Sequence, residues 1–223
     1  MRRIIFPVLM GLVGVGILVS LCLWQLQRLD WKRSILDQID AKISAAPVPL
    51  PASATEASDE YLAVDLRGTP TGQEIHVLSS GTVGGTGYRV ISAFVTDDGR
   101  RVMLDQGILP LMDDSAPMTT AIEAQGNLLW PDDKTSSTPE PDLAKNIWFA
   151  RDVPAMAEAL NTEPLLVVLR AASEYDPRLT PAPVDTSGIK NDHREYAITW
   201  ALLAAVWAVM SGYWVARILR RKD

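Results

Sequence analysis

Two long stretches without a charged side chain constrain this chain most. Residues 4–27 and residues 196–216 contain no Asp, Glu, Lys or Arg, and they are 24 and 21 residues long. A helix of about 20 apolar residues crosses the roughly 30 Å hydrocarbon core of a bilayer. A backbone in lipid must also satisfy its own hydrogen bonds, which a helix does. We therefore predict transmembrane helices at residues 4–27 and 196–216.

The first stretch has a second interpretation, a cleaved secretory signal. Its apolar part is longer than the 7–15 residues usual for such signals. It also continues directly into Trp24 and Gln25 without a small-x-small cleavage site. An uncleaved anchor is the favoured interpretation.

Basic residues beside the two stretches predict the orientation. The stub 1–3 holds two arginines, and the tail 217–223 holds three arginines and a lysine. Such residues mark the cytoplasmic side, so both ends are predicted to be cytoplasmic in the inner membrane. The part between the stretches carries 15 basic and 26 acidic residues, which fits a periplasmic domain at residues 46–195. Its acidity argues against a nucleic-acid partner, because phosphate binding needs a basic face.

The sole cysteine, Cys22, lies inside the first stretch, so the domain at residues 46–195 has no disulfide and no cysteine metal or redox motif. Residues 28–45 keep the helical spacing of the first stretch and are predicted to form a membrane-proximal helix. The proline cluster at residues 47–51 ends that helix, since proline lacks the amide donor.

From Tyr61 onward the apolar spacing changes to two, and Gly, Asp-Gly and Pro punctuate it, which predicts antiparallel strands. Asp97-Asp98-Gly99 is a typical hairpin turn, and Asp152 is placed to cap a short helix at residues 152–160. The predicted class is therefore an α+β membrane protein: two transmembrane helices flank an extracytoplasmic, mainly antiparallel β domain with one short helix, its sheet open or curled into a barrel. The predicted strands lie at residues 61–67, 74–79, 88–96, 101–106, 119–128 and 165–170.

Several candidate sites in the domain have ordinary explanations. The glycine-rich residues 79–87 lack the Lys-Ser/Thr ending of a phosphate loop and favour a hairpin loop. The sequence lacks the Gly-x-Ser-x-Gly motif of a nucleophile elbow. His76 is therefore better explained as a histidine on a strand than as a member of a hydrolase triad. Asp97, Asp98, Asp113 and Asp114 are better explained as solvated turns than as metal ligands. Methionine thioethers can bind copper, but the spacing of Met103, Met112 and Met118 matches no compact site.

The second stretch carries two patterns. Small residues, which allow close helix approach, predict that the two spans pack on each other; they are Ala197, Ala201, Ala204, Ala208 and Gly212, with Gly11, Gly14 and Cys22 on the first span. An aromatic row repeats every seven residues and drifts slowly around a helix: His193, Trp200, Trp207 and Trp214.

His193 lies at the outer end of the second stretch, at the depth of Trp24, Arg28 and Lys32 on the first. An imidazole beside cations at the lipid boundary suits a flat apolar ligand with carboxylates, of which haem is an example. An interfacial histidine that binds nothing is the alternative.

Two blocks of the sequence are distinctive: residues 21–32 (LCLWQLQRLDWK) and residues 191–200 (NDHREYAITW). They are similar to the opening and closing motifs of the surfeit locus protein 1 family of cytochrome c oxidase assembly factors. Residues 87–110 resemble the central motif more weakly. Departures from the family pattern stand at Cys22, Ala93, Gln106 and Ile108.

The resemblance implies an assembly factor, not an enzyme, for an aa3-type haem-copper (cytochrome c) oxidase. It implies that the protein binds haem a and assists its insertion into oxidase subunit I, with haem a synthase as a further candidate partner besides the lipid bilayer. His193 is then the expected ligand of the haem iron. The positions that match the family and inherit the cofactor role are His193, Trp200, Trp24, Arg28, Tyr196 and Gln25. The alternatives are a scaffold without haem and a membrane-anchored binding module such as a polysaccharide chain-length regulator.

Overall fold

The computed structural model describes residues 2–82, 85–111, 113 and 115–220. The chain forms two compact units. One is a helix pair, made of residues 1–38 and 186–223, and the other is a β domain, made of residues 39–185.

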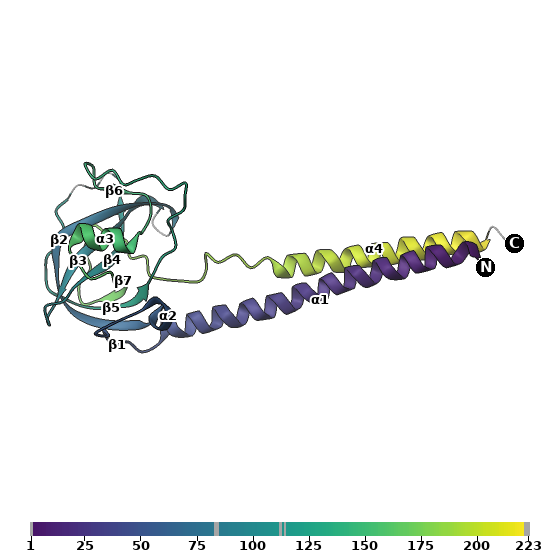
Figure 1. Ribbon diagram of the computed structural model, residues 1–223, viewed down its shortest axis with the longest axis horizontal. Helices are drawn as coiled ribbons and strands as arrows, with labels where there is room; N and C mark the ends of the chain where they lie inside the picture. The colour runs from purple at the N-terminus through teal and green to yellow at the C-terminus, as the bar shows by residue number, and fades with distance from the viewer. Residues whose placement is uncertain (1, 83–84, 112, 114, 221–223) are drawn as a thin grey trace. The chain divides into compact units, whose positions relative to one another are not determined.

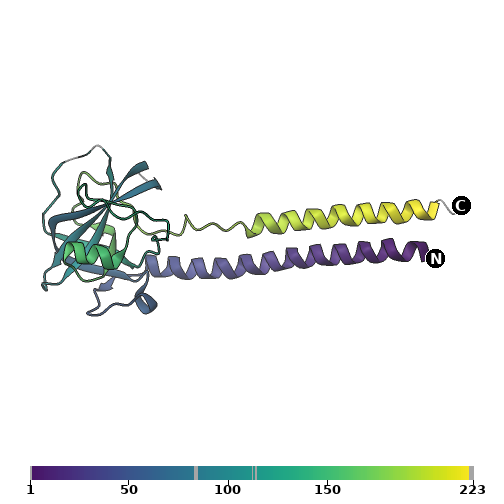
Figure 2. The ribbon, with the colours of Figure 1, turned by 45° about the horizontal axis from the view of Figure 1, so that its top comes forward.

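The helix pair consists of α1 (Arg2–Ser44) and α4 (His193–Arg220). The two helices run antiparallel and side by side, so that the start of α1 and the end of α4 lie together (Figures 1 and 2). Within the described residues these are the two helices long and apolar enough to cross a bilayer. α1 continues without a break to Ser44, so it includes the helix predicted at residues 28–45 except for the last residue.

The last turn of α1 lies within the unit of residues 39–185, and side chains of that unit bond to its carbonyl groups. The last carbonyls of a helix have no partner within it. Arg170 Nη1 donates to the carbonyl oxygens of Ile43 and Ala45 at 2.7 and 3.3 Å, and Asn127 Nδ2 donates to that of Ile43 at 3.0 Å. The helix ends at Ser44, one residue before the predicted end, and the prolines follow from Pro47.

The β domain is built around a closed ring of strands. Hydrogen bonds connect β2 to β3, β3 to β4, β4 to β7, β7 to β5 and β5 back to β2. The β4–β7 pairing is parallel and the other pairings of the ring are antiparallel. The predicted antiparallel sheet is thus curled into a barrel. Its elements are β1 (Val48–Pro49), α2 (Glu56–Asp59), β2 (Ala63–Thr82), β3 (Gly85–Thr96), β4 (Arg101–Pro110), β5 (Ile122–Leu129), β6 (Ile147–Trp148), α3 (Val153–Leu160) and β7 (Leu166–Ala172).

The long strand β2 replaces two predicted strands. A shift of register between Pro70 and Glu74, where Gly72 has φ +82°, bends the strand without ending it. The bend allows the first half of β2 to pair with β5 and the second half with β6. The glycine-rich hairpin prediction falls partly on residues 83–84, which lie outside the described residues.

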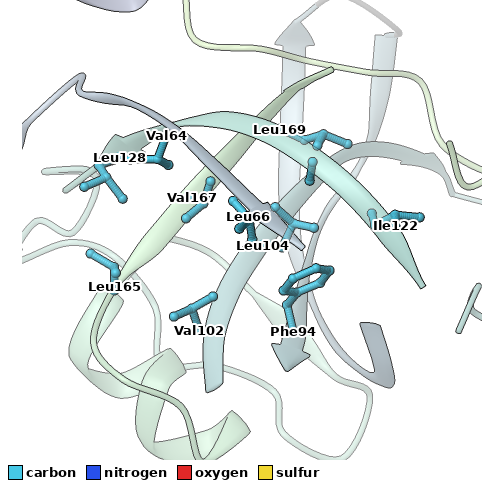
Figure 3. Packing of buried hydrophobic residues seen from close by; sticks show 11 residues of the cluster. Val64, Leu66, Phe94, Val102, Leu104, Ile122, Leu128, Leu165, Val167 and Leu169 are labelled. Atoms are coloured by element: carbon cyan, nitrogen blue, oxygen red, sulfur yellow. The ribbon is translucent and has the colours of Figure 1, made fainter. Parts of the chain in front are cut away.

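Two apolar layers form the core, one on each face of the strands. Inside the barrel, side chains from all five ring strands meet, with Phe94 and Leu104 completely buried (Figure 3). The second layer lies between the outer face and α3, where Met103 and Met156 pack with Trp148. Neighbouring residues such as Met103 and Leu104 therefore enter different layers, as the period of two along a strand requires.

Helix α3 confirms the predicted short helix. The Asp152 carboxylate caps it by accepting a hydrogen bond from Ala155 N at 3.3 Å. At the other end Asn161 adopts the left-handed conformation, with φ +52°, that commonly ends helices. Val153, Met156, Ala157 and Leu160 face the sheet.

Candidate functional site

The register of the helix pair is set where glycines of α1 meet side chains of α4. A Cβ added to Gly14 would lie 2.2 Å from Trp207 Nε1, and one added to Gly11 would lie 2.9 Å from Ser211 Cβ. Gly14 therefore leaves room for the indole ring of Trp207, and Gly11 allows the two helices to approach closely at Ser211. This confirms that the two helices pack through small residues of α1.

The small residues of α4 contribute only in part, which corrects the prediction. Ala197 and Ala204 are buried, but Ala201, Ala208 and Gly212 are exposed, and a Cβ added to Gly212 would meet nothing within 4 Å. The interface follows a seven-residue repeat because two packed helices meet every 3.5 residues. The small residues of α4 are spaced mainly four residues apart, so successive ones lie progressively farther around the helix from the partner.

The aromatic row shares the interface with these alanines. Trp200 is half-buried, and Trp207 packs over Gly14 with 36 % of its surface exposed. Trp214 is 45 % exposed. Trp207 is thus engaged with α1 and is a packing residue of the helix pair.

His193 begins α4 and is joined to α1 by one hydrogen bond. Its Nδ1 lies 2.7 Å from Oε1 of Gln25, which is itself buried. An amide oxygen only accepts hydrogen bonds, so Nδ1 is the donor and carries the proton. A neutral ring with this proton on Nδ1 has its electron pair on Nε2. A histidine that donates its other N–H to an oxygen in this way is the usual arrangement of a metal-ligating imidazole.

A cavity of about 250 Å³ lies beside this pair. Lys32 spans it, since its Nζ donates to the carbonyl oxygen of Lys190. The cavity lining thus combines an imidazole, two lysines, one aspartate and the amino end of a helix, which favours negative charge. Its lining residues are Gln25, Lys32, Lys190, Asp192, His193 and Tyr196.

Two polar atoms in this region are buried without a partner. Over the described part of the chain, nothing hydrogen-bonds to Asn191 Oδ1 or Trp200 Nε1. Buried polar atoms are nearly always paired, so an unpaired one calls for an explanation such as a ligand. Asn191 lies directly between two lining residues in sequence.

The structure brings together three of the six residues suggested for the cofactor. Gln25, His193 and Tyr196 line the cavity, whereas Trp24 and Arg28 are exposed and do not. The Arg28 guanidinium lies 3.6 Å from the centre of the Trp31 ring, a cation–π contact within α1. Lys190 and Asp192 were not suggested from sequence, although their place beside His193 in a basic and polar turn was a signal.

The candidate residues of the β domain have structural partners. His76 Nε2 donates a hydrogen bond at 2.8 Å to the Glu74 carboxylate, and its ring stacks on Tyr88 with the ring centres 5.6 Å apart. Met103 is in the core, and Asp98 and Asp113 bond to neighbouring hydroxyls in turns. Met112 and Asp114 lie outside the described residues. The predictions that His76 lies on a strand and that Asp98 and Asp113 lie in turns are confirmed.

The central motif, residues 87–110, resembles the family only weakly. Its residues in β4 bond to the segment around Thr180, and we call this contact the joint between β4 and that segment. Gln106 Nε2 donates to Ser92 Oγ at 2.7 Å, and the backbones of Ile108 and Thr180 exchange two hydrogen bonds at 2.8 and 2.9 Å. Gly107 has φ +126°, and an added Cβ would lie 2.3 Å from Thr180 O. Glycine is therefore needed here for close approach of two backbones.

Comparison with known proteins agrees with the motifs. The profile of the SURF1 family matches residues 12–205. Surfeit locus protein 1 of Takifugu rubripes is 26 % identical, covering 89 % of this chain and 91 % of the relative. The human surfeit locus protein 1 is 25 % identical over 88 % and 72 %, and a SURF1-like protein of Drosophila melanogaster is 26 % identical over 89 % and 73 %. This chain belongs to the SURF1 family.

Proposed function

We propose that this protein is a membrane-anchored assembly factor for an aa3-type haem-copper (cytochrome c) oxidase, which holds haem a at His193 and assists its insertion into subunit I. Membership of the SURF1 family supports the assembly role. The observation that carries the haem proposal is the hydrogen bond from His193 Nδ1 to Gln25 Oε1. It orients the ring and leaves Nε2 as a ligand atom.

The residues of the cavity fit the chemistry of haem a. Haem a would supply an iron that binds imidazole, together with two propionates. His193 would bind the iron through Nε2, and the ammonium groups of Lys32 and Lys190 would pair with the propionates.

The size of the cavity favours transfer over storage. At about 250 Å³ it is smaller than the roughly 300–1,000 Å³ of pockets that enclose a drug-sized ligand. A macrocycle bound at His193 would therefore project from the helix pair and stay accessible to a partner. Subunit I is the proposed recipient, and haem a synthase is the proposed donor. The role requires binding and release, and no chemical reaction of the protein.

The proposed setting is the inner membrane, with both ends cytoplasmic and the β domain periplasmic. The length and composition of α1 and α4 support the two crossings. The basic residues at both ends support the orientation. His193 and Gln25 would then lie at the outer boundary of the lipid, where a haem released from the membrane is accessible.

The β barrel and the family membership oppose the chain-length regulator, a class that extends long helices outward from the membrane. A scaffold that steadies subunit I without holding haem is the remaining competitor. It shares the family membership but gives no reason for the geometry at His193.

The experiment that separates these two roles is purification from cells that make haem a. We expect the wild-type protein and the His76→Ala variant to carry haem a, and His193→Ala to lose it or show a shifted spectrum, with equal amounts of folded protein. A normal haem content in His193→Ala would reject the ligand assignment. Deletion of the gene should lower oxidase activity and haem a content, and unchanged oxidase would reject the assembly role.

A further inference from the structure

The helix pair contains a second and larger cavity, a groove of about 550 Å³, at the end where α1 begins and α4 ends. Its volume lies within the range of roughly 300–1,000 Å³ that is typical of small-molecule sites. Six of its lining residues carry the argument: Pro7, Met10, Trp207, Met210, Trp214 and Arg217.

The groove is apolar and open to the surroundings of the helices. The side chains of Met10, Met210 and Trp214 are 45 %, 65 % and 45 % exposed. Gly11, which has no side chain, forms part of the lining and deepens the groove between the two helices. An unbranched hydrocarbon chain suits a lining of flexible methionines and flat indoles.

One cationic side chain ends this apolar surface. Arg217 belongs to the lining and lies in the last turn of α4, followed by Arg220 one turn later. In the proposed topology this is the cytoplasmic boundary of the bilayer. Basic pockets between transmembrane helices on that side bind the head groups of anionic lipids.

The groove is separate from the proposed haem site. Along α4, Trp207 lies about 21 Å and Arg217 about 36 Å from His193 at ~1.5 Å per residue. The two cavities share no lining residue. An occupant of the groove is therefore independent of the ligand at His193.

We propose that the groove binds an anionic phospholipid, with an acyl chain along Met10, Met210 and the two tryptophans and the phosphate on Arg217. The combination of an apolar channel with a guanidinium at one end matches a lipid of this charge. A neutral phospholipid would fill the channel but leave the guanidinium without an anion. The inference rests on the proposed membrane crossing and not on haem binding.

Native mass spectrometry of the full-length protein, released from micelles that contain equal amounts of phosphatidylglycerol and phosphatidylcholine, tests the proposal. We expect the wild-type protein to retain phosphatidylglycerol preferentially. Arg217→Gln should lower that preference about fivefold, as expected for one arginine near an anionic surface. Met210→Trp, which fills the groove without changing charge, should displace lipid of both kinds.

Two controls make the result specific. Arg194→Gln removes an exposed cation near the opposite end of α4 and should leave the preference unchanged. His193→Ala should also retain phosphatidylglycerol, which separates this site from the haem proposal. Equal retention of the two lipids by the wild type, or equal losses in Arg217→Gln and Arg194→Gln, would overturn the lipid site alone. Extraction of the wild-type protein from membranes by carbonate would overturn the proposed crossing and the lipid site together.

Discussion

Gln25 gains its importance from one atom, the amide oxygen that accepts the hydrogen bond from His193. Without that acceptor the imidazole could place its proton on either nitrogen. With it, the proton stays on Nδ1 and Nε2 is available to a metal. The same bond also connects α1 to α4 at the level of the cavity.

Replacing Gln25 should therefore change the tautomer of His193. In Gln25→Leu we expect a mixture of both tautomers, because the acceptor is gone. In Gln25→Glu we expect the Nδ1–H form to persist, because a carboxylate accepts the same bond. The ¹⁵N chemical shifts of the imidazole, recorded with labelled histidine in a His76→Ala background, distinguish the two forms.

The haem affinity should follow the tautomer. Loss of an outer-shell partner typically costs about 10–100-fold in metal affinity, so Gln25→Leu should weaken haem binding by that order and Gln25→Glu should not. The proposed positioning role of Gln25 is wrong if the leucine variant keeps a pure Nδ1–H ring.

Arg178 holds two buried carboxylates in the β domain. Its guanidinium lies 3.1 Å from Glu74 and 2.8 Å from Asp176, and all three side chains are less than 10 % exposed. Burial by itself would raise the pKa of Glu74 and of Asp176. The hydrogen bonds from His76 and Arg178 to Glu74, and those from Arg178 and Met118 N to Asp176, outweigh burial and leave both pKa values below the ordinary ones.

Arg178→Ala should destabilise the protein by about 3–5 kcal/mol at neutral pH, the usual cost of leaving a buried charge without its partner. In the wild type, both carboxyls contribute stability above their ordinary pKa values of 4.5 and 3.8, and this contribution is lost as the pH falls through the lowered values.

The variant should respond in the opposite direction, since protonation removes its unpaired charges. The difference in thermal stability between the two proteins should thus shrink from pH 7 to about pH 4. Thermal unfolding of the full chain in detergent at both pH values measures it. A difference that is constant with pH would contradict this account of the cluster.

At the level of the elements, the contact of α1 with α4 depends on the lack of a side chain at Gly14. Gly14→Leu would place carbon atoms where the Trp207 ring lies, and we expect the helices to separate locally. Gly16→Ala is the matched control, since an added Cβ there meets nothing within 4 Å. Alanine should even favour the helix by about 1 kcal/mol.

Disulfide formation between Gly11→Cys and Ser211→Cys, in a Cys22→Ser background, reports the contact. These positions are neighbours across the helix pair, so the bond should form readily in the parent and with Gly16→Ala, and more slowly with Gly14→Leu. Equal rates in all three would show that the Gly14–Trp207 contact does not set the packing.

The joint between β4 and the segment around Thr180 is a second case of contact between elements. The buried carboxyl of Asp105 has its pKa raised by burial, against the pull of Arg89, whose Nη1 lies 2.7 Å away. Arg89 also donates to Ala182 O at 3.3 Å. The central motif thus holds the segment around Thr180 and Ala182 against the barrel, although it resembles the family only weakly.

For the whole molecule, the decisive prediction concerns topology. A reporter that is active only in the periplasm should be active when inserted at Pro131 and inactive when fused to the carboxyl end. The basic residues at both ends carry this expectation. Activity at the carboxyl end, or silence at Pro131, would reject the two-crossing arrangement.

The sequence alone determined the features that repeat over short distances. Charge-free runs predicted α1 and α4, a period of two predicted the ring strands, and Asp152 marked the start of α3. These features are encoded locally, because helix and strand periodicity and capping depend on neighbouring residues. The family motifs likewise identified His193 and Gln25 as candidate cofactor residues, one in each terminal motif, without indicating that they are in contact.

Only the tertiary structure decided how these parts meet. It showed that β5 returns to β2 and closes the barrel, and that the interface of α4 takes Ala197 and Ala204 but not Ala201 and Ala208. It also joined Gln25 to His193 across 168 residues of chain. Contacts at such separation depend on helix register and strand closure, which no local pattern contains. The arrangement that leaves Nε2 of His193 free is therefore a property of the fold and not of either motif.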